Sequence, residues 1–173
     1  MEKRGRVILS TKRRKISLDD VSFRVAKQED SHNIKKLIDN TVDVSYKNSY
    51  SQQAIDFFKN HHSLSAIKDD LEKEYLIVWE VKDELIGTGT LADNEIARVF
   101  IRPDLQRNGL GKMIMEKLER VVCLKEIRMV YLDASLFAYQ FYKALGYQTI
   151  SKEAIEVNGE EKLNYFEMRK KLN

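Results

Sequence analysis

The sequence predicts an α/β protein of the α+β type: a strand, two helical regions, three antiparallel strands, a helix, a strand, a helix and a closing hairpin. Three observations support this prediction. Apolar residues recur at steps of three and four in the helical segments. A glycine-containing loop joins an apolar strand at 95–101 to an amphipathic helix. Two hairpin signals, Lys82-Asp83-Glu84 and Asn158-Gly159, connect neighbouring strands.

The first half of the chain is predicted to supply one strand and both helical regions. The strand covers 22–26, and a helix follows from about Asp30, where Asp30 or Ser31 can cap its first turn. A second helical region from Ser51 to about Lys73 is expected to break around 60–62. The apolar faces of the two regions contain Ile34, Leu37 and Ile38, and Ile55, Phe57, Phe58, Leu64, Ile67 and Leu71.

The chain after residue 74 is predicted to hold six strands and two helices. One helix begins near Asn108. The other is capped by Ser135 and ends at Gly146, because glycine suits the left-handed conformation that follows many helices. The strands are expected at 75–81, 85–91, 95–101, 127–132, 148–157 and 163–168.

Composition indicates an ordinary globular protein. With 173 residues, 43% hydrophobic and 33% charged, the chain fits one domain, expected over 16–173. The single cysteine, Cys123, is interpreted as a buried, inert thiol, and a reducing cytoplasm is the expected compartment. No apolar run approaches the roughly 20 residues of a membrane span, and no signal peptide is evident. The histidines, His32 and His61-His62, lack metal-ligand spacing, so no metal is expected.

Basic charge is concentrated in residues 1–15, which carry seven Lys or Arg side chains against Glu2 alone. Since the whole chain has a net charge of +3, this tail holds +6 and the remainder −3. Solvated disorder, or an edge strand through 7–9, is the simpler interpretation. A nucleic-acid arm is the alternative, although a nucleic-acid partner is not expected. Residues 7–9 or the final hairpin could also serve a homodimer.

The loop after the strand at 95–101 predicts a site for a diphosphate. It reads Gln106-Arg-Asn-Gly109-Leu-Gly111-Lys, with no acidic residue after Asp104, and it leads into a helix. Unpaired N–H groups and the positive end of the helix dipole favour an anion, and glycines allow its close approach. The spacing fits neither G-x-x-x-x-G-K-[ST] nor G-x-G-x-x-G, which excludes the two commoner phosphate loops.

The pattern Gln106-x-x-Gly109-x-Gly111 after an apolar strand resembles the coenzyme A loop of the GNAT family of N-acetyltransferases. The segment from Leu132-Asp-Ala-Ser135 to Gly146-Tyr147 resembles the second signature of that family, in the right order along the chain. Together these resemblances imply the GNAT fold over about 22–170. That fold is a mixed, mostly antiparallel sheet of about six to seven strands flanked by about four helices.

The resemblance implies acetyl-CoA as co-substrate. Its diphosphate would rest on the backbone of the loop, and its pantetheine arm would pair with the end of the strand, whose side chains belong to the core. Arg107 and Lys112 could add charge or remain solvated. The expected contacts are Val99, Phe100, Ile101, Gln106, Arg107, Asn108, Gly109, Leu110, Gly111, Lys112, Ser135 and Tyr142.

The resemblance also implies two catalytic residues. Tyr142 matches the general-acid tyrosine that protonates the departing thiolate, although a helix tyrosine is otherwise a packing residue. Glu95 resembles the general-base glutamate of the histone-acetylating branch of the family. The alternative is that Glu95 only ends the turn at Asp93-Asn94, exposed to solvent.

The expected partner is an amine-bearing acceptor, whether a small molecule or a protein. The family binds it between the first helices and the final hairpin, which here offer Tyr46, Tyr50, His61, His62, Asn158 and Glu160. Each of these is also an ordinary loop or helix-edge residue. The expected activity is acetyl transfer to a primary amine by direct attack in a ternary complex. The competing interpretation is a non-catalytic module that senses acyl-CoA or binds a partner.

Overall fold

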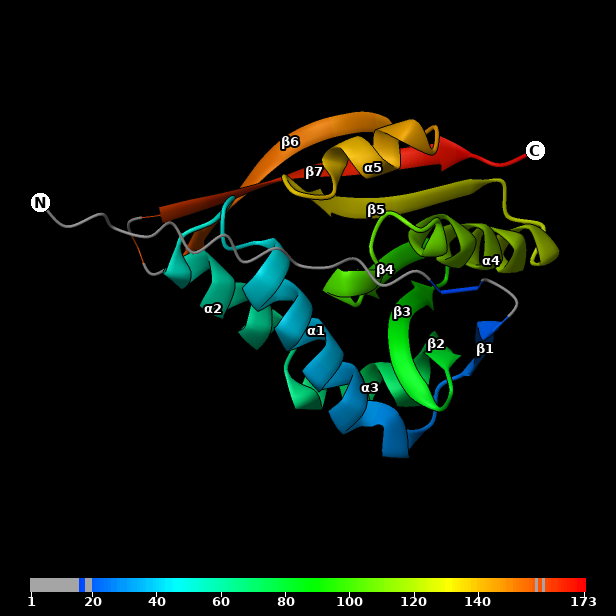
Figure 1. The fold of residues 1–173 in the computed structure, drawn as a ribbon. Coiled ribbons are helices and arrows are strands. Elements are labelled where there is room, and N and C mark those ends of the chain that lie inside the picture. The colour runs from blue at the N-terminus through cyan, green and yellow to red at the C-terminus, as the bar shows by residue number, and fades with distance from the viewer. Residues whose placement is uncertain (1–15, 18–19, 158, 160) are drawn as a thin grey trace, which may run out of the picture.

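The structure is a computed structural model that describes residues 16–17, 20–157, 159 and 161–173. The expectations for 1–15, Asn158 and Glu160 lie outside these residues. In chain order the elements in Figure 1 are β1 (Ser22–Val25), η2 (Gln28–Asp30), α1 (Ser31–Ser45), α2 (Gln52–His61), α3 (Leu64–Lys73), β2 (Tyr75–Val81), β3 (Glu84–Ala92), β4 (Glu95–Ile101), η3 (Pro103–Leu105), α4 (Leu110–Leu124), β5 (Met129–Ser135), α5 (Tyr139–Ala144), β6 (Gln148–Val157) and β7 (Glu161–Lys171).

The seven strands form one sheet in the order β1-β2-β3-β4-β5-β7-β6, and only the β4–β5 pair is parallel. Helices α1 to α3 cover one face, and α4 and α5 cover the other (Figure 1). The predicted fold class is confirmed. The helical region 51–73 divides at its predicted break into α2 and α3, which are capped by the Ser51 and Ser63 hydroxyls. The described residues therefore form five α-helices.

Strands β4 and β5 separate soon after they meet. Their register contains one residue pair, Glu95 opposite Tyr131, and the Tyr131 N–H donates to the Asn94 carbonyl at 3.0 Å. On either side of this split the sheet is well paired, since β3 pairs with β4 and β5 with β7 along most of their lengths. The sheet therefore opens in its middle, between the C-terminal parts of two parallel strands.

A β-bulge at Arg98 changes which side chains of β4 face each helix layer. Arg98 has φ +49°, and neither it nor Val99 has a partner in the register with β3. Ile96 and Ile101 pack in the core on the α4 side, whereas Phe100 packs in the core on the α1–α3 side. The buried Phe100 and Ile101 side chains confirm the expectation that these residues belong to the core.

Two expected helix starts are corrected by the structure. Helix α4 begins at Leu110 rather than near Asn108, because Gly109 takes φ +84° as its N-cap residue. Ser135 does not cap α5: it ends β5, and its hydroxyl accepts from the Ala138 N–H at 3.3 Å in the turn before the helix. Gly146, with φ +90°, adopts the predicted left-handed conformation after α5.

Smaller corrections concern strand ends and one side chain. Strand β5 begins at Met129 rather than at 127, and β7 covers Glu161–Lys171 rather than 163–168. Residues Val157 and Glu161 pair across the predicted hairpin, and Gly159 has φ +79°. Cys123 is half-buried at the edge of the core rather than fully buried.

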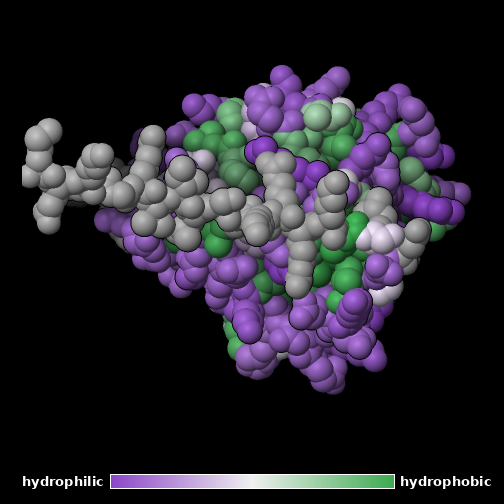
Figure 2. All heavy atoms as spheres, viewed as in Figure 1, coloured by the Kyte–Doolittle hydropathy of each residue, from purple (hydrophilic) through white to green (hydrophobic). Residues whose placement is uncertain are grey.

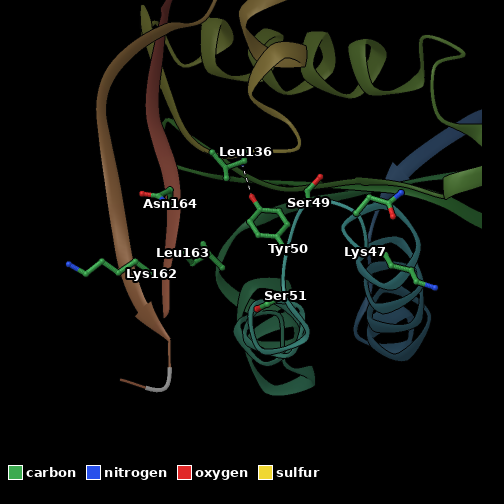
Figure 3. Close-up of a pocket in the computed structure, with 9 residues that line it drawn as sticks. Lys47, Ser49, Tyr50, Ser51, Leu136, Lys162, Leu163 and Asn164 are labelled. Carbon is green, nitrogen blue, oxygen red and sulfur yellow. Dashed lines mark hydrogen bonds between the residues drawn. The ribbon is translucent and has the colours of Figure 1, made fainter. Parts of the chain in front are cut away.

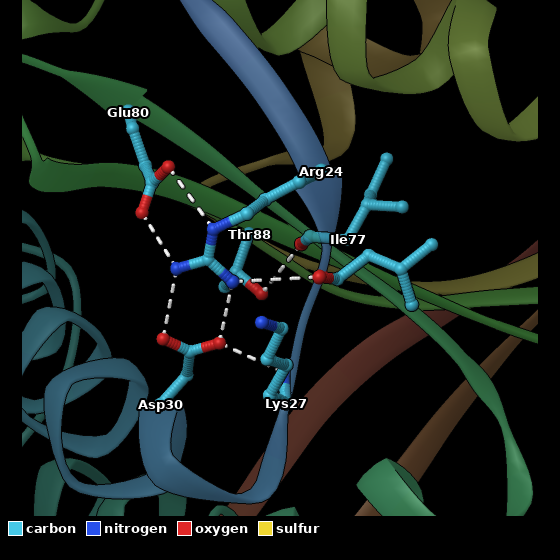
Figure 4. Close-up of polar contacts among 7 residues, drawn as sticks. Arg24, Lys27, Asp30, Ile77, Glu80 and Thr88 are labelled. Carbon is cyan, nitrogen blue, oxygen red and sulfur yellow. Dashed lines mark hydrogen bonds and ion pairs between the residues drawn. The ribbon is translucent and has the colours of Figure 1, made fainter.

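The first strand is tied to the helices by one arginine (Figure 4). The Arg24 guanidinium donates to Asp30 at 2.7 and 2.9 Å and to Glu80 at 2.7 and 3.1 Å. Asp30 also accepts from the Lys27 N–H at 2.8 Å, so its carboxylate fixes this turn and makes no side-chain cap on α1. These contacts hold β1, β2 and α1 together.

The face shown in Figure 2 is mainly hydrophilic, with apolar side chains gathered in smaller areas between the polar ones. Within the described ranges, no helix has both the length and the apolar character needed to cross a bilayer.

Candidate active site

A cavity of about 230 Å³ lies where β4 and β5 separate. Its walls come from the end of α1, from α2, from β4 and β5, from the start of α5 and from β6 and β7. Because Tyr142 packs in the core on the α4 side and Phe100 in the core on the α1–α3 side, the cavity touches both layers. Two reactants could therefore meet in it from opposite faces of the sheet.

Most of the catalytic and acceptor candidates named from the sequence meet in this cavity. Of the residues predicted from the sequence, those that line the cavity are Glu95, Val99, Phe100, Ser135 and Tyr142, together with Tyr46, His61 and His62. Ile101 and the loop 106–112 do not line it. The cavity thus unites the two expected catalytic residues, which are far apart in the chain, whereas the expected diphosphate site is a separate surface.

Tyr142 is a buried polar residue of the cavity, as is Tyr46. Only 7% of the Tyr142 surface is exposed, and its ring packs against Phe141 and Tyr147. No other described residue hydrogen-bonds to its hydroxyl. Burial raises the pKa of Tyr142, so the phenol stays protonated across the physiological range. The Tyr142 hydroxyl is therefore a neutral proton donor that no acceptor among the described residues engages.

Two carboxylates border the cavity on neighbouring strands. Glu95 is the exposed first residue of β4, and Asp133 lies on β5 two residues beyond the partner of Glu95. Asp133 is itself exposed on β5, but partial desolvation raises its pKa, and the charges of Glu95 and Glu167 raise it further. Asp133 was missed by the sequence interpretation. The only signal was its place between Leu132 and Ala134, whose buried side chains direct Asp133 to the opposite face.

His62 is held as a neutral hydrogen-bond donor. Its Nδ1 lies 2.5 Å from the Arg98 guanidinium, which has only N–H donors, so Nδ1 must accept and Nε2 carries the hydrogen. Arg98 is in turn fixed by Asp70 at 2.5 Å. Burial lowers the pKa of His62 to about 3, with the charge of Arg98 as the second cause. The bulge in β4 is therefore anchored to α2 and α3.

We expect His62 to make stability depend on pH. The unfolded chain binds a proton at His62 near pH 6.5, whereas the folded protein does so only near pH 3, so stability is lost as pH falls through this window. Between pH 7 and pH 5 the free energy of unfolding should fall by about 1 to 2 kcal/mol more in the wild type than in His62→Gln. Urea unfolding at the two pH values measures this difference.

A matched control for this prediction is His32→Gln, which changes an exposed histidine of α1. This variant should keep the pH dependence of the wild type. Equal pH dependence in the wild type and His62→Gln would contradict a neutral, buried His62.

The loop before α4 presents a glycine backbone to open space. Gly109 provides no side-chain cap, and a Cβ added there would meet nothing within 4 Å. The first N–H groups of a helix lack partners within it, so the start of this 15-residue helix can bind an anion. Arg107 and Lys112 are exposed beside it, and Lys112 lies 3.6 Å from Glu116.

Other polar side chains of the loop are used to hold it in place. Gln106 Nε2 donates to Ser45 Oγ at 3.0 Å and to the Ile101 carbonyl at 3.1 Å, which ties the loop to α1 and β4. Asn108 Nδ2 donates to the Leu105 carbonyl at 3.1 Å. Gly111 lies against Phe141, whose Cζ would be only 3.0 Å from an added Cβ. Gly111 thus allows Phe141 of α5 to pack closely against α4.

A second cavity, of about 340 Å³, lies between the α1–α2 loop and β7 (Figure 3). Tyr50 lines it, and its hydroxyl accepts from the Leu136 N–H at 2.7 Å. Lys47 and Lys162 are also at its edge, but it contains no carboxylate. It shares Leu163 with the first cavity, so the two hollows adjoin. The described residues contain no cluster of three or more His, Cys, Asp or Glu side chains able to hold a metal ion.

Comparison with known proteins gives a consistent result. The family model described as an acetyltransferase (GNAT) domain matches residues 46–172. The Escherichia coli protein named uncharacterized N-acetyltransferase YafP is 22% identical over 149 residues, which cover 86% of this chain and 95% of YafP.

Two solved structures show the same fold. A GCN5-related N-acetyltransferase from Rhodopseudomonas palustris aligns with a TM-score of 0.83 at 18% identity, covering 91% of this chain and 99% of the other. The PaiA N-acetyltransferase of Thermoplasma acidophilum, solved with coenzyme A, aligns with a TM-score of 0.69 at 17% identity, covering 87% of this chain and 98% of PaiA.

Proposed function

Because the chain belongs to the GNAT family of acetyltransferases, we propose that it transfers the acetyl group of acetyl-CoA to a primary amine by direct attack in a ternary complex. One observation carries this proposal. A buried tyrosine hydroxyl without a partner and two carboxylates border a single cavity at the split between β4 and β5. This arrangement provides a proton donor for the leaving thiolate and proton acceptors for the attacking amine.

The donor would bind across the α4 side of the sheet. Its diphosphate would lie on the N–H groups at the start of α4, where Gly109 leaves the backbone open. Its pantetheine arm would follow β4 toward the cavity, since β4 has no partner in the register with β5 beyond Glu95. A backbone N–H near Val99 would then meet the negative charge that develops on the thioester oxygen. PaiA, solved with coenzyme A, supports a nucleotide carrier as the ligand.

The attacking nitrogen requires a base. At pH 7 a lysine-like amine is neutral in only about 0.04% of molecules, a handicap of roughly 4 to 5 kcal/mol. Glu95 borders the cavity and would accept a proton from the nitrogen, directly or through water. On the other side, Tyr142 would protonate the departing sulfur, and solvent would restore its proton.

Direct attack is favoured because no residue of the cavity is prepared to form an acyl-enzyme. Cys123 is on α4 and does not line the cavity. The Ser135 hydroxyl is engaged with the Tyr46 hydroxyl at 3.2 Å and with the Ala138 N–H. Neither has the neighbouring base that activates a nucleophile.

The test is a screen of amine acceptors with acetyl-CoA and detection of the released thiol. The panel should include alkylamines, polyamines, amino acids, aminoglycosides and peptides with free N-termini or lysines. We expect thiol release that depends on at least one amine and yields its acetamide. Saturable binding of acetyl-CoA without amine-dependent thiol release across the panel would instead support the non-catalytic alternative.

A further inference from the structure

Asp133 borders the cavity without a basic partner in the described part of the chain. No Lys, Arg or His side chain of the described residues forms an ion pair with Asp133 or with Glu95. Elsewhere, carboxylates with such partners include Asp30, Asp39, Asp70, Glu80, Asp104 and Glu119. Asp133 and Glu95 are both exposed on adjoining strands, where their like charges repel, so a cation beside them is favoured, and no side chain of the described residues supplies it.

Asp133 is also directed toward the reacting centre. Along β5, Leu132 and Ala134 are buried on the α4 side, so Asp133 and Ser135 lie on the face of the cavity. The register pairs Glu95 with Tyr131, so Asp133 lies further along β5 toward Ser135 and the start of α5. Glu95 sits at the level where the two strands still meet. Asp133 is thus the carboxylate that borders the opened part of the split.

An independent feature of the same cavity indicates that a ligand belongs there. The Tyr142 side chain is 93% buried, since 7% is exposed, and its hydroxyl borders the cavity without a hydrogen bond from any other described residue. Buried hydroxyls are normally paired, so an incoming group is expected to complete this one. Tyr46, Phe57 and Phe58 form an aromatic wall, and aromatic faces attract cations.

We propose that Asp133 binds the ammonium group of the acceptor and takes its first proton, so that the acceptors are alkylamines that are cationic in solution. This inference rests on the proposed acetyltransferase function. The pKa of Asp133, raised by partial desolvation and by Glu95 and Glu167, supports the assignment because a more basic carboxylate accepts a proton more readily.

The proton balance assigns a role to each group. The ammonium nitrogen gives one proton to Asp133, and its lone pair forms the C–N bond to the thioester carbon. As the C–S bond breaks, sulfur takes the proton of Tyr142, and the nitrogen gives its second proton to Glu95. One of the two protons on the carboxylates replaces that of Tyr142 through solvent, and the other leaves. The net products are the amide, the free thiol of coenzyme A and one proton.

The test compares two acceptors of nearly the same shape. Benzylamine is protonated at pH 7, whereas phenylhydrazine, in which NH replaces the CH₂ group, is mostly neutral. If Asp133 removes the first proton, Asp133→Asn should lower kcat/KM for benzylamine by at least about thirtyfold and for phenylhydrazine by at most about threefold. The Kd of acetyl-CoA should stay unchanged. A loss of packing would lower both rates together and would not change their ratio.

The control is Glu153→Gln, which changes an exposed carboxylate of β6 that does not line the cavity, and it should leave the ratio of the two rates unaltered. Equal losses for both acceptors in Asp133→Asn, or no loss for either, would overturn the assignment. Turnover by the wild type of amines that are neutral at pH 7, but of no amine that is cationic at pH 7, would overturn the acceptor class while leaving acetyl transfer intact. Thiol release that does not depend on any amine would contradict the proposed function itself.

Discussion

Replacing Tyr142 by phenylalanine should lower turnover at least tenfold while leaving the Kd of acetyl-CoA nearly unchanged. The hydroxyl lines the cavity and has no protein partner among the described residues, so its loss removes the proton donor of the thiolate without breaking a contact. For the same reason, the free energy of unfolding should change by less than about 1 kcal/mol. Steady-state kinetics, calorimetry and urea unfolding measure the three quantities.

Tyr147→Phe is the matched control for this prediction. The Tyr147 ring lies 5.8 Å from that of Tyr142, but its hydroxyl donates to the buried Glu119 at 2.9 Å. This variant should lose about 1 to 3 kcal/mol of stability and keep turnover within about twofold. Unchanged turnover in Tyr142→Phe, with a good acceptor, would remove Tyr142 from the mechanism.

Gly109→Ala should raise the Kd of acetyl-CoA at least tenfold. At φ +84° an alanine is strained by about 1 to 2 kcal/mol, so the backbone would shift and misdirect the N–H groups at the start of α4. The new Cβ would also stand in the open space through which the diphosphate approaches. Calorimetric titration of the variant with acetyl-CoA measures the loss.

Gly159→Ala is the control that separates the effect of backbone strain on stability from the loss of acetyl-CoA binding. Gly159 also has positive φ, +79°, and a Cβ there would likewise meet nothing within 4 Å, but it lies in the hairpin between β6 and β7. Both variants should lose similar stability, and only Gly109→Ala should bind acetyl-CoA more weakly. Equal Kd values for the two variants would show that the start of α4 does not hold the diphosphate.

The order of elements and the identity of the fold could be predicted from the sequence because they depend on local signals. Helical periodicity, the break around 60–62 and the turn residues at Gly109, Gly146 and Gly159 act within a few neighbouring positions. The family resemblance placed Tyr142 and Glu95 at one site, and the structure places both on one cavity.

The remaining features depend on contacts between distant segments. Arg98 has a positive φ in β4, and Asp70 and His62 on other elements hold its side chain. No local pattern indicates this. Asp133 joins the site only because β4 and β5 separate after one residue pair. Such tertiary contacts override local preference and are not visible in one sequence.

Two residues assigned from local pattern make contacts that the sequence did not indicate. Ser135 resembles a helix cap, but α5 begins four residues later because β5 continues through Ser135 to pair with Tyr165. Gln106 was expected at the coenzyme. Its side chain ties the loop to Ser45 and the Ile101 carbonyl, so support of the loop is the role that its contacts indicate.

Calorimetric titration of the wild-type protein with acetyl-CoA, compared with S-acetylpantetheine, tests the central claim most directly. That claim is that the N–H groups at the start of α4 hold the diphosphate and thereby place the thioester beside Tyr142. It predicts saturable binding of one acetyl-CoA below millimolar concentration, and binding at least about tenfold weaker for the ligand without a diphosphate. No saturable heat with acetyl-CoA at millimolar concentration, or equal affinity for the two ligands, would contradict it.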